Sequence, residues 1–151
     1  MAVFYKRRDY TRIVNGRNPI VKHEFLGESV EGKDLIIVDD MISSGDSVLD
    51  IANQLKAKNA GRIFVCTSFG LFTEGLASFD EAYEKGWITK VITTNLIYQP
   101  EELLARPYYE TADMSKYIAL LIDALNHDGS ISEYLNPAAR IQKLLQKYGK
   151  R

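Results

Sequence analysis

The sequence has a single cysteine and no long apolar run. One cysteine excludes an internal disulfide and a zinc site built on several cysteines, and it is typical of a protein of the reducing cytoplasm. The longest apolar stretches, such as residues 35–38, are far too short to cross a bilayer. At the start of the chain the charged residues Lys6, Arg7 and Arg8 follow the apolar ones, the reverse of a signal peptide. We therefore expect a cytoplasmic protein without a membrane partner.

An excess of charge of one sign is also missing. The chain carries 19 basic and 20 acidic side chains, which gives a formal net charge of −1. No overall electrostatic field would attract nucleic acid, so we expect no nucleic-acid partner, and any bound anion must be held by a local site. With 151 residues and 46% hydrophobic content, the composition predicts one globular domain over residues 1–151.

From Lys33 onward, short β-branched runs alternate with helical patterns, which predicts an α/β fold with a largely parallel sheet flanked by helices. The continuous apolar run 35–38 indicates a strand covered on both faces and ending at Asp39. Before it, Val21 to Leu26 indicate one strand of a hairpin that leads to this run. The other expected strands are 62–68, 90–94 and a short one at 107–111. The expected helices are 48–55, 76–85, one capped by Asp113 and running to Leu125, and an appended amphipathic helix at 137–149.

The stretch between the first of these strands and its helix carries the strongest chemical signal. Parallel sheets bind ligands at the carboxyl ends of their strands, and a loop of small residues at a helix N-terminus suits a phosphate. The adjacent carboxylates would accept hydrogen bonds from ribose hydroxyls, so the pattern predicts a phosphorylated pentose. A Walker A loop is disfavoured because no Gly-Lys-Ser/Thr follows. A solvated acidic pair beside an ordinary turn stays open as the alternative. The residues concerned are Asp39, Asp40, Ser43, Ser44, Gly45, Asp46 and Ser47.

This segment resembles the phosphoribosyl pyrophosphate motif of the type I phosphoribosyltransferase fold, and more specifically the carboxyl-terminal half of the ribose-phosphate pyrophosphokinase family. Tyr5-Lys6-Arg7-Arg8 is similar to the flexible catalytic loop of that family. The resemblance covers nearly the whole chain up to Pro137. Further segments that carry it are 30–34, 69–72, 91–95, 114–118 and 126–132.

The resemblance implies transfer of the β,γ-diphosphoryl group of ATP, with Mg²⁺, to the 1-hydroxyl of ribose 5-phosphate. Lys6 and Arg8 would neutralise charge that develops on the phosphates during the reaction. Asp39 and Asp40 would bind the ribose hydroxyls, and residues 43–47 would cradle the 5-phosphate. It also implies a homo-oligomer or association with an amino-terminal half, which in the family binds adenine and magnesium. No metal ligand of this chain follows from it.

The chain departs from the family pattern at Asp46 and in its length. The Asp46 carboxylate either favours the helix N-terminus and points away, or weakens phosphate binding by repulsion. Family synthetases have about twice this length, so we expect a partial enzyme that binds ribose 5-phosphate better than it catalyses. Two alternatives remain: a phosphoribosyltransferase that uses phosphoribosyl pyrophosphate, and a non-catalytic, ribose-phosphate-binding regulatory subunit.

Overall fold

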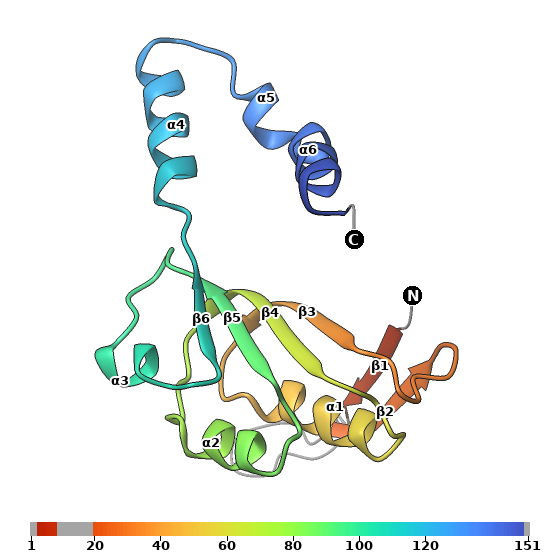
Figure 1. Ribbon diagram of the computed structural model, residues 1–151. Coiled ribbons are helices and arrows are strands. Elements are labelled where there is room, and N and C mark those ends of the chain that lie inside the picture. The colour runs from red at the N-terminus through yellow and green to blue at the C-terminus, as the bar shows by residue number, and fades with distance from the viewer. Residues whose placement is uncertain (1–2, 9–19, 150–151) are drawn as a thin grey trace. The chain divides into compact units, whose positions relative to one another are not determined.

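The computed structural model describes residues 3–8 and 20–149 (Figure 1). Contacts group the chain into two compact units, one extending to Ala112 and the other beginning at Asp113. Each unit is described by itself.

The first unit contains a four-stranded parallel sheet with the order β3-β4-β5-β6 (Figure 1). Its strands are β3 Leu35–Ile42, β4 Ile63–Gly70, β5 Lys90–Thr94 and β6 Tyr109–Ala112. The helices between them are α1 Asp46–Lys56, α2 Ala77–Glu84 and the short α3 Glu101–Leu104, which the sequence pattern did not indicate. The prediction of an α/β fold with a largely parallel sheet is confirmed.

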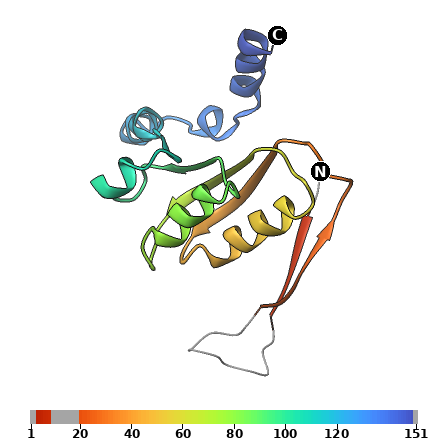
Figure 2. The same cartoon turned by 60° about the horizontal axis from the view of Figure 1, so that its bottom comes forward.

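The core lies between the sheet and the two longer helices, α1 and α2, which lie on the same face of the sheet (Figure 2). Alternate residues of the strands point into it, since side chains of a strand alternate between its two faces. Burial of these apolar side chains is the main stabilising term of the unit. The fully buried members include Ala52, Ile63, Val65, Phe79 and Val91.

The prediction that the apolar run 35–38 is covered on both faces is wrong for the residues described in this unit. Ile36 and Val38 are 68% and 78% exposed, whereas Leu35 and Ile37 pack against the core. Ile36 and Val38 point to one face of the sheet, whereas α1 and α2 both cover the other face. In addition, β3 is the edge strand of the four-stranded sheet, so it has a neighbouring strand on one side only. The strand also continues to Ile42 instead of ending at Asp39.

The amino-terminal segment forms a two-stranded antiparallel sheet of β1 Val3–Arg8 and β2 Ile20–Leu26. The predicted hairpin strand at 21–26 is therefore present, but its partner is β1 and not the strand that follows Lys33. Residues 5–8, which we expected to form a loop, belong to β1. The high β propensity of the run Val3-Phe4-Tyr5 and the backbone pairing with β2 account for this difference.

The second unit consists of α4 Ser115–Asn126, α5 Ser132–Leu135 and α6 Ala138–Tyr148. The Asp113 carboxylate, expected to cap the first of these helices, accepts a hydrogen bond from the Ser115 backbone N–H at 2.9 Å. The Tyr117 hydroxyl donates to the Tyr134 carbonyl and so links α4 to α5. α6 corresponds to the appended helix predicted at 137–149. In the part of the chain described, no helix combines the length and apolarity needed to cross a membrane.

A polar cluster fastens the start of β6 to α2. Asp80 Oδ1 accepts hydrogen bonds from the Tyr108 hydroxyl at 2.7 Å and from Arg106 Nε at 2.9 Å. Arg106 also donates to Glu102 of α3. Tyr108 is only 1% exposed. Burial, and then the neighbouring Asp80 carboxylate, raises the pKa of the Tyr108 hydroxyl far above its usual range.

This raised pKa predicts a loss of stability at high pH. The native state holds the Tyr108 proton more tightly than the unfolded chain does, so the contribution is complete below the ordinary tyrosine pKa of 10.0. It decreases as the pH rises through that value toward the pKa of the folded state. Between about pH 9 and pH 11, the free energy of unfolding in urea should therefore fall less in Tyr108→Phe than in the unaltered protein. Tyr98→Phe is the control because Tyr98 is 84% exposed. Equal slopes in the two variants would contradict the prediction.

Candidate functional site

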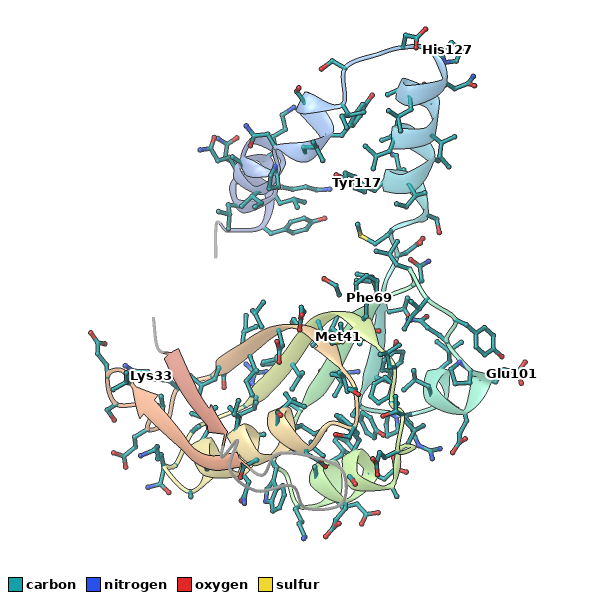
Figure 3. All side chains as sticks on the ribbon, turned by 180° about the vertical axis from the view of Figure 1, so that it is seen from behind. Lys33, Met41, Phe69, Glu101, Tyr117 and His127 are labelled. Atoms are coloured by element: carbon teal, nitrogen blue, oxygen red, sulfur yellow. The ribbon has the colours of Figure 1, made fainter. Side chains whose placement is uncertain are left out.

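The acidic pair lies near the carboxyl end of β3, inside the strand rather than after it. Asp39 is opposite Thr67 of β4, and Met41 is opposite Phe69. Figure 3 shows Met41 and Phe69 close together at one end of the sheet and Lys33 at the other. Because the strands are parallel, their carboxyl ends meet at this edge, which is where such sheets bind ligands.

Both carboxylates are exposed, and each is oriented by a neighbouring backbone group. Asp39 Oδ1 accepts a hydrogen bond from the backbone N–H of Asp40 at 2.9 Å, and Asp40 Oδ1 accepts one from that of Met41 at 2.7 Å. Within the described part of the chain, the other oxygen of each carboxylate, Oδ2, has no such donor. Each residue therefore presents one oxygen atom that can accept a hydrogen bond from a ligand hydroxyl.

The loop that follows is shorter than predicted. α1 begins at Asp46, so only Ser43, Ser44 and Gly45 form the loop, and Asp46 and Ser47 belong to the first helical turn. The first backbone N–H groups of a helix have no partner within it, so an acidic residue is stabilising in this turn. We call residues 43–47, which the sequence predicts to hold a phosphate and which include the first two residues of α1, the phosphate loop. It keeps the predicted composition and joins the carboxyl end of β3 to the N-terminus of α1, where the Asp46 N–H donates to Ser44 Oγ at 3.5 Å.

The segment after β4 supports the phosphate loop from one side. The backbone N–H of Leu71 donates to the Ile42 carbonyl at 2.8 Å, and that of Thr73 donates to the Ser43 carbonyl at 3.0 Å. These bonds fix the carbonyls at the start of the loop.

Gly45 is the residue at which the chain turns into α1. Its φ of +94° lies in the region that favours glycine, and its carbonyl accepts the N–H of Leu49 at 3.0 Å. A Cβ at this position would lie 2.6 Å from Phe79 Cζ and closer still to Phe79 Cε2. Both the backbone conformation and the neighbouring ring therefore require glycine.

Asp46 interacts with Ser44, another residue of the phosphate loop. Ser44 Oγ donates a hydrogen bond to Asp46 Oδ2 at 2.9 Å. The Ser44 hydroxyl thus donates its hydrogen bond to Asp46. The Asp46 carboxylate also places a negative charge at the start of α1, where the sequence predicts a phosphate.

The predicted catalytic residues lie on β1, where Lys6 is opposite His23 and Arg8 is opposite Ile20. Their side chains lie outside the described part of the structure.

Sequence reasoning missed a hydrogen-bond network that joins the connection after β5 to the end of β5 and to side chains of β6. Gln99 Nε2 donates to the Tyr109 hydroxyl at 2.7 Å and to the Thr94 carbonyl at 3.0 Å, while Gln99 Oε1 accepts from the Thr111 hydroxyl at 3.0 Å. The Tyr109 hydroxyl also lies 2.6 Å from Thr93 Oγ1. These bonds fasten the segment after β5 to the sheet edge that carries the site. A glutamine in a loop gives no signal of such a role in the sequence.

Among the described residues, no group of three or more His, Cys, Asp or Glu side chains is placed to hold a metal ion. Mg²⁺ is usually held by one or two carboxylates together with substrate phosphates, and the acidic pair supplies two carboxylates. Cys66 is half-buried, and burial raises the pKa of its thiol, which favours the packing role over a reactive thiolate.

Fold and site together define an α/β protein with an acidic pair and a glycine-centred loop at the carboxyl edge of a parallel sheet. Residues 13–136 match the family described as the phosphoribosyl synthetase-associated domain, and the chain belongs to this family.

Relatives in this family are considerably longer. A ribose-phosphate pyrophosphokinase of Vibrio parahaemolyticus is 31% identical over 136 residues, which make up 90% of this chain and 40% of that protein. The human phosphoribosyl pyrophosphate synthase-associated protein 2 is 34% identical over 106 residues, 70% of this chain and 28% of that one. The chain thus spans two fifths or less of the length of these relatives.

A solved structure supports the fold. The crystal structure of phosphoribosylpyrophosphate synthetase from Mycobacterium smegmatis superposes with a TM-score of 0.62 at 23% identity, covering 72% of this chain and 35% of the other.

Proposed function

We propose that this chain is the ribose 5-phosphate-binding part of a ribose-phosphate pyrophosphokinase, corresponding to the carboxyl-terminal half of such an enzyme. The reaction transfers the diphosphoryl group of ATP to the 1-hydroxyl of ribose 5-phosphate and releases AMP. One observation carries the proposal: the acidic pair at the end of β3 leads directly into a loop that turns at Gly45 into the N-terminus of α1.

The roles of the residues follow from their chemistry. Oδ2 of Asp39 and of Asp40 accepts hydrogen bonds from the ribose hydroxyls, since carboxylate oxygens are strong acceptors. The backbone N–H groups at the start of α1 bind the 5-phosphate. Lys6 and Arg8 of β1 supply positive charge to the phosphates of ATP, as phosphoryl transfer requires.

The proposed reaction requires Mg²⁺, which would bind together with ATP. Mg²⁺ dehydrates reluctantly and is usually held by one or two carboxylates together with substrate phosphates. An amino-terminal half, in the same polypeptide or as a second subunit, supplies the adenine site and completes a homo-oligomeric enzyme. The family match and the relatives named ribose-phosphate pyrophosphokinase support the proposed pyrophosphokinase function.

A second candidate function is that of a non-catalytic, ribose-phosphate-binding subunit. The observation that favours it is Asp46, whose carboxylate accepts a hydrogen bond from the Ser44 hydroxyl inside the phosphate loop and would repel a phosphate bound there. One relative carries the name of a synthase-associated protein rather than a synthase.

Calorimetric titration of the purified chain with ribose 5-phosphate tests the proposal. We expect saturable binding that is tighter than binding of ribose or of inorganic phosphate alone, because only ribose 5-phosphate engages both the acidic pair and the loop. No binding of ribose 5-phosphate would refute the proposed site.

A second measurement distinguishes the two candidate functions. AMP formation from ATP and ribose 5-phosphate is followed with Mg²⁺ present, with and without a separately supplied amino-terminal half. Binding together with AMP formation under either condition identifies the pyrophosphokinase. Binding without AMP under both conditions favours the non-catalytic subunit.

A further inference from the structure

We propose that Phe79 of α2 is a positioning residue for the phosphate loop: its ring sets the path of the loop at Gly45. This inference rests on the proposed function and extends it to a residue outside the predicted site. Phe79 is fully buried, and α2 lies beside α1 on the same face of the sheet (Figure 2).

The first observation is the contact between the ring and the loop backbone. The position that a Gly45 Cβ would occupy is 2.6 Å from Phe79 Cζ and 3.5 Å from Phe79 Cδ2. Such short distances mean that the edge of the ring lies directly against the backbone of Gly45, leaving no room for a side chain.

The second observation is that the ring is itself held. Phe72 packs edge-on against Phe79, with the ring centroids 5.1 Å apart and an interplanar angle of 77°. Phe72 belongs to the segment after β4, in which the N–H groups of Leu71 and Thr73 donate to the carbonyls of Ile42 and Ser43. The phosphate loop is therefore confined by Phe79 and by this segment.

The loop has little means of fixing its own geometry, because Gly45 is its one buried residue and has no side chain, and the other four residues of 43–47 are polar. Binding of a phosphate by backbone N–H groups depends on their directions, and a shift of about 0.5 Å is enough to impair a preorganised site. A rigid buried ring at the turn supplies the missing constraint. We infer that Phe79 determines phosphate affinity without touching the ligand.

The test compares Phe79→Leu with Phe64→Leu. Phe64 lies on β4 and is half-buried, and its side chain faces away from the core, so the control makes the same chemical change at a distance from the loop. We expect Phe79→Leu to weaken binding of both inorganic phosphate and ribose 5-phosphate about tenfold and Phe64→Leu to leave both unchanged. Phe79→Tyr serves as a second variant that retains the ring and places an oxygen against Gly45, should the leucine variant not fold.

Amide hydrogen exchange at residues 44–47 provides a readout that needs no ligand. Faster exchange there in Phe79→Leu, but not in Phe64→Leu, supports the positioning of the loop by Phe79 even if the unaltered chain binds no ribose 5-phosphate, a result that would refute the proposed function alone. If the Phe79 variants retain the affinity of the unaltered protein, or if exchange at these amides is unchanged, the inference is wrong. Equal losses in both leucine variants would also overturn it, because they would indicate general destabilisation.

Discussion

Changing Asp39 and Asp40 together to asparagine should weaken ribose 5-phosphate binding by about 100-fold or more. Hydrogen bonds to charged groups contribute about 1.5–3 kcal/mol each, and two such acceptors are lost. The substitution is selective because asparagine keeps an oxygen for the bonds that Oδ1 accepts from the backbone N–H groups of Asp40 and Met41. Only Oδ2 changes, from an acceptor to an NH₂ donor, and Oδ2 is the atom assigned to the ribose hydroxyls.

The same variant should bind inorganic phosphate as well as the unaltered protein does, or more tightly, because two negative charges near the loop are removed. A matched control is the double change Glu101→Gln and Glu102→Gln. It neutralises two exposed carboxylates that follow one another in sequence at the start of α3. Calorimetric titration with both ligands checks the prediction. Equal ribose 5-phosphate affinity in the two variants would show that the acidic pair does not bind the sugar.

The sequence was most informative where local patterns and tertiary packing agree. The strand predicted at 90–94 from its β-branched residues has the observed bounds, and in the structure its buried residues, Val91 and Thr93, alternate with half-buried ones. β3 extends further than predicted because aspartate has low strand propensity, yet parallel pairing with β4 carries the strand on to Ile42. Tertiary hydrogen bonding overrides local preference at this point, and it places the acidic pair inside the strand.

The supports of the site could not be read from the sequence. Phe79 is an ordinary core residue by its helical spacing, and its contact with Gly45 depends on how α2 lies beside α1. Gln99 has its partners Tyr109 and Thr111 on the next strand. Local pattern gives the residue types that bind a ligand, whereas the residues that orient them are distinguished only by contacts between segments distant in the chain.

Replacing Gly45 by alanine is expected to lower the free energy of unfolding by about 2–4 kcal/mol. Two separate costs combine: a non-glycine residue at a φ of +94° is strained by about 1 kcal/mol or more, and overpacking a core typically costs about 1–3 kcal/mol. The overpacking arises because the new methyl group would meet the ring of Phe79. Urea unfolding of the variant measures the sum.

Gly75→Ala separates the two costs. Gly75 has a similar φ of +79°, but a Cβ there would meet nothing within 4 Å, so its replacement should cost only the backbone strain of about 1 kcal/mol. The extra loss in Gly45→Ala then measures the collision with Phe79, and it should shrink when Phe79→Leu removes the ring edge, leaving mainly the backbone term. Equal destabilisation by the two alanine substitutions would mean that the loop moves away from the ring without cost. In that case Gly45 is required for its backbone conformation alone, and the aromatic support of the phosphate loop would have to be abandoned.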